Sequence, residues 1–183
     1  MTVSNKIVVI GGTACGPKAA ARARRCDPTA KITIIEQGDN LSTATCGLPY
    51  YVSGVIDSQN ALMARAQDFF TDVMNMEVLT ATRATAILTD AHRIQVTDLK
   101  NGHAADIEYD KLVMATGALP YIPNVDGVNL KGIFTMSKIR NFNHCGVYSV
   151  SFHPIFRSTK LSVEKNRRQS IFLLCGSNCS QCD

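Results

Sequence analysis

The chain has 183 residues, of which 45% are hydrophobic, and a formal net charge of +4 at pH 7. This length is sufficient to bury the core of one domain with an appendage. No apolar run approaches the roughly 20 residues of a membrane-spanning helix, and the apolar run before Gly11 is too short for a signal peptide. We therefore expect a cytoplasmic protein in which the seven cysteines do not form a disulfide framework.

The positive charge is concentrated near the C-terminus. Residues 143–183 contain five basic and two acidic side chains, so residues 1–142 carry a net charge near +1. No basic patch with interleaved aromatic residues occurs in residues 1–142, which argues against binding to nucleic acid. The pattern also changes at about Asn143. We expect a domain over residues 1–142 and a divergent, basic, cysteine-rich tail over residues 143–183, either frame-shifted or disordered.

The first motif is a strand followed by a glycine turn and a helix. Residues Lys6–Ile10 form a short apolar, β-branched run, typical of a strand buried on both faces. The turn Gly11-Gly12-Thr13-Ala14-Cys15-Gly16 follows at once, and Pro17 opens an alanine-rich helix that extends to about Arg25. In this context the free N–H groups and the helix dipole receive a pyrophosphate.

The next strand supports a dinucleotide site. Ile32–Ile35 is a second buried strand, and Glu36 stands at its end, 20 residues after Gly16. An acidic residue at this place binds the ribose hydroxyls of an adenosine. Thr13 occupies the position of the middle glycine, so the turn departs from the pattern G-x-G-x-x-G. Strand, turn, helix, strand and Glu36 together favour a dinucleotide site over a chance glycine turn.

The remaining pattern up to residue 142 predicts an α/β fold. Residues 60–76 are helical in pattern, with a core face made of Phe69, Phe70 and Val73. Short strands follow at about Glu77–Leu79, Thr85–Leu88, Ile94–Thr97 and Asp106–Tyr109, with a turn at Asn101-Gly102 between the last two. A further buried-type strand, Lys111–Ala115, leads into Thr116-Gly117. We thus expect a Rossmann-like domain, with a parallel sheet, helices and a small antiparallel β-meander.

One cysteine lies in a loop that opens a predicted helix. Cys46 stands within the stretch Ser42–Tyr51, between small or hydroxylated residues and Gly47-Leu48-Pro49. A thiol at a helix N-terminus is a candidate redox nucleophile, because the helix end stabilises the thiolate. Most single cysteines are instead small buried hydrophobic residues.

Three stretches carry a family resemblance, namely I-V-V-I-G-G-T-A-C-G-P-K-A-A-A-R-A-R-R, S-T-A-T-C-G-L-P-Y-Y-V-S-G and Y-D-K-L-V-M-A-T-G-A-L-P. By their order and spacing, roughly residues 5 to 140 resemble the pyridine nucleotide–disulfide oxidoreductase superfamily. Within it they resemble the single-cysteine branch of coenzyme A–disulfide reductases and NADH oxidases. The resemblance implies an FAD-binding domain. Its FAD-binding residues would be Gly11, Gly12, Gly16 and Glu36 on the pyrophosphate and ribose, Ala115, Thr116 and Gly117 in a second turn, and Ala84 near the adenine.

The resemblance also implies the redox chemistry of Cys46. Dithiol reductases of the superfamily have a second cysteine five residues after the first, where this chain has Tyr51. Cys46 would therefore cycle through a mixed disulfide with a small thiol, a persulfide or a sulfenic acid. The electrons would come from NAD(P)H through the flavin.

A basic stripe on the first helix has two interpretations. Lys18, Arg22 and Arg25 lie at positions i, i+4 and i+7, on one helix face. The stripe is either a solvated surface or, as the resemblance implies, part of a coenzyme A channel together with Ser42 and Thr45. Three cations suit the phosphates of that substrate.

The other cysteines are weaker candidates for a functional role. We interpret Cys15 as a small packing residue and Cys26 as incidental. The C-x3-C-x2-C spacing resembles an iron–sulfur motif, but the chain ends one residue later, so we expect no metal site there; its cysteines are Cys175, Cys179 and Cys182.

The family continues beyond about residue 140 with a second βαβ unit for NAD(P)H and a dimerisation domain. We therefore interpret the chain as a truncated product, with a homodimer only in the full-length family and little NAD(P)H turnover by itself. Its partner would be a small-molecule thiol or disulfide of the coenzyme A type. Two alternatives stay open: an NADH oxidase or peroxidase that cycles through a Cys46 sulfenic acid, and a non-catalytic FAD-binding module.

Overall fold

The computed structural model describes residues 4–130, 134–137 and 172–173. Its described residues belong to two compact units, one made of residues 4–44 and 63–117 and the other of residues 45–62 together with the described residues after 117. The domain boundary predicted at residue 142 lies outside the described residues.

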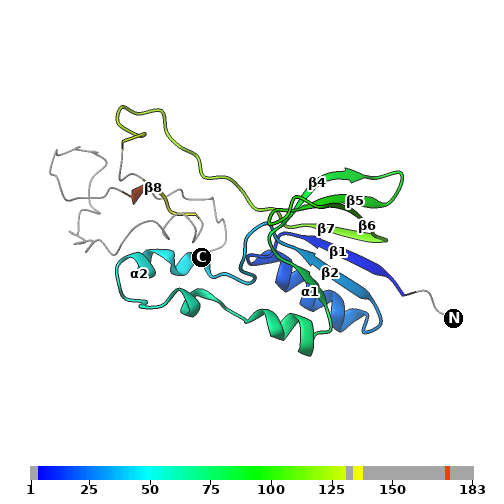
Figure 1. The fold of residues 1–183 in the computed structure, drawn as a ribbon. Coiled ribbons are helices and arrows are strands. Elements are labelled where there is room, and N and C mark those ends of the chain that lie inside the picture. Colours follow the sequence, from blue (N-terminus) through cyan, green and yellow to red (C-terminus); the bar gives the residue numbers. More distant parts are fainter. Residues whose placement is uncertain (1–3, 131–133, 138–171, 174–183) are drawn as a thin grey trace. The chain divides into compact units, whose positions relative to one another are not determined.

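The first unit is built on a four-stranded parallel sheet in the order β3-β2-β1-β7. Figure 1 labels β1, β2 and β7 of this sheet, with helix α1 against them. The central pair is in register from Lys6 opposite Lys31 to Ile10 opposite Ile35, as expected for two buried apolar runs. The elements are β1 (Lys6–Ile10), α1 (Cys15–Cys26), β2 (Lys31–Ile35), β3 (Glu77–Leu79) and β7 (Lys111–Met114).

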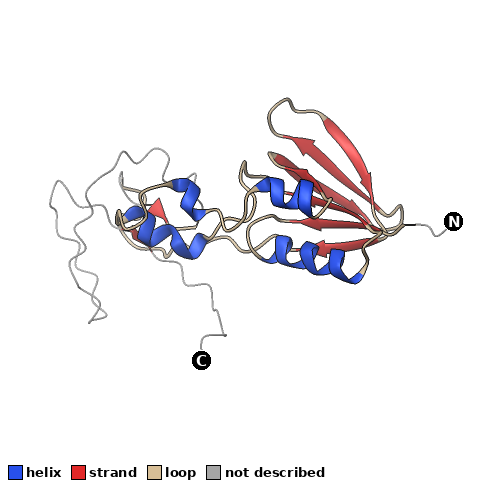
Figure 2. Ribbon diagram, turned by 90° about the horizontal axis from the view of Figure 1, so that it is seen from below, coloured by secondary structure: helices blue, strands red, loops and turns tan. Residues whose placement is uncertain are grey.

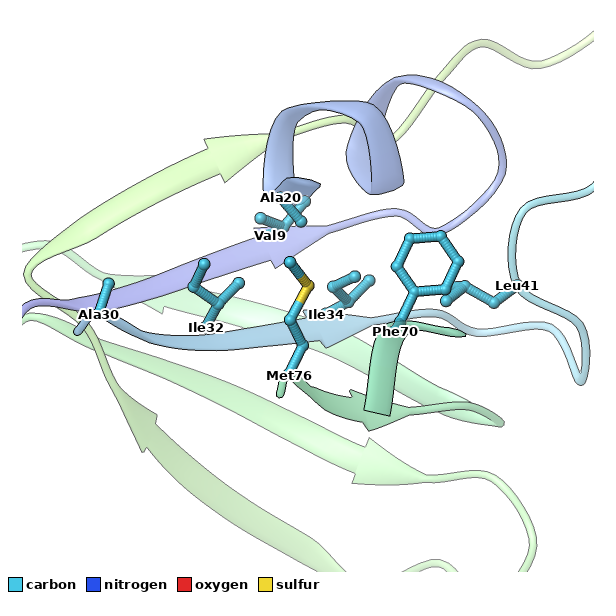
Figure 3. Packing of buried hydrophobic residues seen from close by; sticks show 8 residues of the cluster. All are labelled: Val9, Ala20, Ala30, Ile32, Ile34, Leu41, Phe70 and Met76. Atoms are coloured by element: carbon cyan, nitrogen blue, oxygen red, sulfur yellow. The ribbon is translucent and has the colours of Figure 1, made fainter. Parts of the chain in front are cut away.

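Alternate side chains of strand β1 pack into two different hydrophobic clusters, because successive residues of a strand point to opposite faces. On one face Val9 packs with Ala20 of α1 and with Phe70, as Figure 3 shows. The small Ala20 side chain lets the helix lie close to the sheet. On the other face Val8 and Ile10 join the second core cluster.

The second cluster is completed by a three-stranded antiparallel sheet in the order β4-β5-β6. Its strands are β4 (Thr82–Leu88), β5 (Arg93–Asp98) and β6 (Ala104–Glu108). Ile94 and Val96 of β5 are buried against the parallel sheet. The predicted Asn101-Gly102 turn is confirmed: Gly102 has φ +75° and its N–H donates to the carbonyl of Asp98 at 2.8 Å. The expected parallel sheet with an antiparallel meander is therefore present.

The helix predicted over residues 60–76 is wrong. The structure has a 3-10 helix η2 (Gln59–Leu62) and a π-helix η3 (Phe69–Val73), and between them Met63 pairs as an isolated bridge with Thr43. In the π-helix the hydrogen bonds run from i to i+5, so Phe69 and Val73 no longer lie above one another as in an α-helix. Phe70 is buried as predicted, but Val73 is 71% exposed.

The second unit contains short helical turns, which are blue in Figure 2 like all helices. They are η1 (Thr45–Gly47), α2 (Leu48–Val52) and η2, and Leu48 and Leu62 are buried. A two-residue strand β8 (Phe134–Thr135) pairs in parallel with β9 (Phe172–Leu173). In the part of the chain that the structure describes, no helix is long and apolar enough to cross a membrane.

One arginine on α1 links three segments of the first unit. The guanidinium of Arg24 donates to the carbonyl oxygens of Pro28 and Ala30 at 2.8 and 2.7 Å. It also donates to those of Met74 and Asn75 at 2.9 and 2.6 Å. Only a planar guanidinium offers enough directed donors for four carbonyl groups. Arg24 thus ties the end of α1 to the entry of β2 and to the segment before β3.

We predict that Arg24→Ala lowers the free energy of unfolding by about 2–3 kcal/mol, because hydrogen bonds from a charged donor are lost and carbonyl groups are left without a partner. Urea denaturation measures the difference. Arg25→Ala is the matched control, since Arg25 is exposed and adjacent, and it should cost less than about 1 kcal/mol. Equal losses of unfolding free energy in the two variants would contradict the role of Arg24 in linking the three segments.

Candidate functional site: a glycine turn and an exposed cysteine

The glycine turn lies where β1 ends and α1 begins, and it leaves no room for side chains. A β-carbon on Gly11, whose φ is +107°, would collide with the carbonyl oxygen of Ala115. A β-carbon on Gly16 would collide with the carbonyl oxygen of Gly11. The chain therefore needs glycine at both positions to pass from strand to helix beside the end of β7.

The acidic residue at the end of β2 contacts the same turn. The Gly12 N–H donates to Oε2 of Glu36 at 2.6 Å, and the Gly38 N–H donates to Oε1 of the same carboxylate at 2.7 Å. The Glu36 backbone is itself held by hydrogen bonds to Leu79 and Thr82. The structure thus brings Glu36 and the glycine turn together.

The first turn of α1 can receive an anion. Helix α1 has no side-chain cap at Ala14 and no acidic residue in its first turn. Its first N–H groups are therefore not satisfied by a side chain, and they carry the positive end of the helix dipole. Thr13, Ala14 and Cys15 are exposed, so the outside of the turn is open to solvent. These residues fit the pyrophosphate of a dinucleotide.

The second predicted turn follows β7. The Ala115 N–H donates to the carbonyl of Ile10 at 2.8 Å, which extends the pairing of β1 and β7 by one residue. Thr116 and Gly117 are exposed, and Gly117 has φ +69°. Ala115 and Gly11 therefore lie side by side at the carboxyl ends of β7 and β1. Ala84, the residue predicted near the adenine, pairs with Val96 next to a bulge in β4.

The candidate redox cysteine belongs to the second unit. Cys46 lies in η1 with an exposed, free thiol. The predicted helix follows it, but α2 begins at Leu48 and has five residues. Gly47 lets the η1 turn pack closely against Leu62 of the same unit, since a β-carbon on Gly47 would lie 2.7 Å from the Leu62 side chain. The alternative that Cys46 is a buried hydrophobic residue is excluded.

The predicted substrate residues fall into two groups. Lys18, Arg22 and Arg25 are exposed on α1 in the first unit, and Ser42 is there as well. Thr45 is exposed beside Cys46 in the second unit.

The basic stripe has no carboxylate partner nearby. Over residues 4–130 the ion pairs join Glu108 to Lys6 at 2.7 Å and to Arg93 at 3.4 Å. None of the three basic side chains of α1 therefore has an acidic partner in that part of the chain.

Ser42, expected beside a substrate channel, makes backbone hydrogen bonds that hold the loop after β2 in place. It is only 8% exposed and has φ +57°. Its N–H donates to the carbonyl of Gly12 at 2.7 Å, and its carbonyl accepts from Ala64 at 2.8 Å. Ser42 therefore ties the chain that leads toward Cys46 to the glycine turn.

Two other expectations concern cysteines. Cys15 and Cys26 are both exposed, so the packing role expected for Cys15 is wrong, because as the first residue of α1 it points outward. Among the described residues, no group of three or more His, Cys, Asp or Glu side chains could hold a metal ion. The Cys175, Cys179 and Cys182 cluster lies outside the described residues.

The ion pair of Lys6 and Glu108 lies away from the glycine turn, because Lys6 stands at the opposite end of β1. The hydrogen bond from Lys6 lowers the pKa of Glu108. A cavity of about 180 Å³ is found there, lined by Lys6, Ala91, His92, Glu108, Tyr109 and Asp110. This cavity adjoins none of the predicted site residues.

The comparison with protein families agrees with this geometry. Residues 5–154 match the family model described as pyridine nucleotide-disulphide oxidoreductase. The chain belongs to this family. Two relatives are similar to most of the chain. It is 35% identical over 133 residues to the NAD(P)H coenzyme A polysulfide/persulfide reductase of Pyrococcus horikoshii, covering 73% of this chain and 29% of that protein. It is 28% identical over 136 residues to the NADH oxidase of Methanocaldococcus jannaschii, covering 74% and 30%.

Solved structures agree on the fold. Reduced CoADR-RHD of Bacillus anthracis aligns with a TM-score of 0.72 and 30% identity, over 76% of this chain and 25% of that one. The NAD-dependent persulfide reductase of A. fulgidus aligns with a TM-score of 0.69 and 39% identity, over 74% and 25%. The Rossmann-like FAD-binding fold is thus confirmed, and FAD and NAD(P)H are the cofactors of the family. The chain spans about 29% of the length of the Pyrococcus relative.

Residues outside the motif also shape the turn. A β-carbon on Gly12 would collide with Leu41 and would lie 2.9 Å from Cβ of Glu36. Leu41 is buried in the core cluster with Phe70 (Figure 3). Nothing in the local pattern indicated Leu41 or Gly38, because both act through the three-dimensional path of the loop after β2.

We predict that Gly12→Ala weakens FAD binding by about five- to a hundredfold, since the added methyl group collides with Leu41 and Glu36 and overpacking costs about 1–3 kcal/mol. Flavin fluorescence titration measures the affinity. Gly102→Ala is the matched control, because it adds the same methyl group outside the glycine turn, where nothing lies within 4 Å of it. A Gly12→Ala protein with the wild-type affinity would show that the turn does not hold the cofactor.

Proposed function

We propose that the chain is the FAD-binding part of an NAD(P)H-dependent reductase of coenzyme A disulfides or persulfides, with Cys46 as its single redox cysteine. The observation that carries this proposal is the glycine turn, closed against Ala115 and contacted by Glu36, in the same chain as an exposed thiol. The names of the Pyrococcus and A. fulgidus relatives support the class of substrate.

The residues that would hold FAD all belong to the first unit. The backbone N–H groups of the glycine turn and of α1 would bind the pyrophosphate, and Glu36 would accept hydrogen bonds from the ribose hydroxyls. Ala115, Thr116 and Gly117 would line the second side of the cofactor, with the backbone of Ala84 near the adenine. When bound, FAD supplies the electron pair, drawn from NAD(P)H, that reduces the cysteine's disulfide.

Cys46 would open the substrate by thiol–disulfide exchange. Its thiolate attacks one sulfur of the disulfide, a bond forms between Cys46 and that half, and the other half leaves as a thiolate that takes up a proton. The position five residues after Cys46 is Tyr51, so no internal disulfide can form between those positions. The exposure of Cys46 lets a substrate as large as coenzyme A disulfide reach it.

The basic stripe of α1 would recognise the substrate. Lys18, Arg22 and Arg25 are exposed on one helix face and have no carboxylate partner within residues 4–130. Such side chains are free to bind phosphate groups. We further propose that Thr45 and Ser42 act beside the cysteine, with Ser42 acting through the backbone that it orders.

We also propose a cytoplasmic location, because the free thiols of Cys15, Cys26 and Cys46 suit a reducing compartment. Within the described residues, one glycine turn has the geometry of a dinucleotide site. We further propose that this chain by itself turns over NAD(P)H poorly.

A second candidate is an NADH oxidase or peroxidase in which Cys46 becomes a sulfenic acid. The similarity to the Methanocaldococcus NADH oxidase and the open thiol favour it. Peroxide converts an accessible thiolate to a sulfenic acid, which dimedone traps. Dimedone labelling of Cys46 after peroxide, without a coenzyme A adduct after incubation with the disulfide, would select this candidate.

We predict that coenzyme A disulfide adds one coenzyme A to Cys46 faster than to the other exposed thiols, and that dithiothreitol removes it. Mass spectrometry of digested protein locates the adduct. Cys46→Ser should abolish the fast phase, whereas Cys26→Ser, which removes another exposed thiol, should leave it intact. If Cys46→Ser keeps the fast phase, Cys46 is not the redox cysteine and a non-catalytic flavin-binding module becomes the better account.

We predict that replacing Lys18, Arg22 and Arg25 together by Ala slows this modification at least about threefold, because three phosphate contacts of modest strength are lost. The rate with the neutral bis(2-hydroxyethyl) disulfide should not change. Stopped-flow release of the free thiol measures both rates.

The matched control removes three other exposed lysines, Lys31, Lys100 and Lys111. This control loses the same charge, so an equal slowing in both triple variants would show a general charge effect and contradict a specific coenzyme A surface.

A further inference from the structure

Glu36 makes two hydrogen bonds that need no ligand. Each oxygen of its carboxylate accepts a different backbone N–H, Oε2 from Gly12 at 2.6 Å and Oε1 from Gly38 at 2.7 Å. The carboxylate therefore bridges the glycine turn after β1 and the turn after β2. Such short bonds from neutral donors to a charged acceptor are among the stronger hydrogen bonds in proteins.

The bond to Gly12 matters because Gly12 is buried. Leu41 closes one side of this residue and the side chain of Glu36 closes another. The Gly12 carbonyl already accepts from Ser42 at 2.7 Å. Without the carboxylate, a buried N–H would lose its acceptor, which costs more than the net value of an ordinary hydrogen bond.

We propose that Glu36 is a positioning residue that holds the glycine turn in its nucleotide-binding conformation before any nucleotide arrives. The inference rests on the proposed function for its consequence, which is that the ligand finds a turn already ordered. A carboxylate has about four lone-pair sites, and the two backbone bonds use two of them. The same carboxylate therefore serves the turn and keeps sites for ligand hydroxyls.

Because both oxygens accept from backbone N–H groups, we expect that an amide cannot replace the carboxylate. In Glu36→Gln one of the two side-chain atoms is an NH2 group, which faces a backbone N–H and cannot accept from it. The isosteric change keeps the volume but breaks one arm of the bridge. Part of the free energy of nucleotide binding is then used to order the turn, so the affinity is lower, as for any site that is not preorganised.

The test is amide hydrogen exchange followed by NMR on the nucleotide-free protein. We expect the Gly12 and Gly38 amides to be protected in the wild type, and Glu36→Gln to speed the exchange of at least one of them by about tenfold or more. Asp39→Asn is the matched control: it makes the same chemical change at an exposed carboxylate three residues away and should leave both rates unaltered.

A parallel titration with ADP separates this inference from the proposed function. If Glu36→Gln weakens ADP binding while both amides keep wild-type protection, the positioning role is overturned and the nucleotide site stands. If the wild type binds neither ADP nor FAD while Glu36→Gln loses protection, the positioning role stands and the proposed function is contradicted. Unprotected Gly12 and Gly38 amides in the wild type would overturn the inference even if Glu36→Gln failed to fold.

Discussion

The first unit depends on one close approach between backbones. The carbonyl oxygens of Gly11 and Ala115 lie where β-carbons on Gly16 and Gly11 would stand, so strand β1, helix α1 and strand β7 meet without intervening side chains. This contact fixes where α1 begins, and the first turn of α1 has neither a side-chain cap nor an acidic residue. We propose that a dinucleotide binds there, at the carboxyl end of the strands.

The local order of the elements could be predicted because the physical signals are local. Apolar, β-branched runs predicted β1, β2 and β7, and the spacing from Gly16 placed Glu36 at the end of β2. The helix over residues 60–76 could not be predicted correctly, because the pairing of Met63 with Thr43 and the π-helix at Phe69–Val73 are set by tertiary contacts. Periodicity describes an α-helix, and it misplaces a residue such as Val73 when the hydrogen-bond spacing changes.

The candidate site was predictable in its residues and less so in their surroundings. The motif identified Gly11, Gly12 and Gly16, but not the wall that Leu41 builds over Gly12. Ser42 was expected at a substrate channel, yet burial and its left-handed backbone give it a structural bond to the turn. Cys15 was expected to pack and is exposed. For Leu41 and Ser42 the deciding contact is with Gly12, about 30 residues away in the sequence, and no single-sequence pattern reports such a contact.

The central claim is that the glycine turn of the first unit holds FAD. Titration of the purified, nucleotide-free chain with FAD, followed by flavin fluorescence and by absorbance of the protein after gel filtration, tests it directly. The account predicts saturable binding of about one FAD per chain, with competition by ADP, since both ligands carry the pyrophosphate and ribose that the turn and Glu36 recognise. FAD that elutes free of a folded protein, with no saturable change in fluorescence, would contradict it.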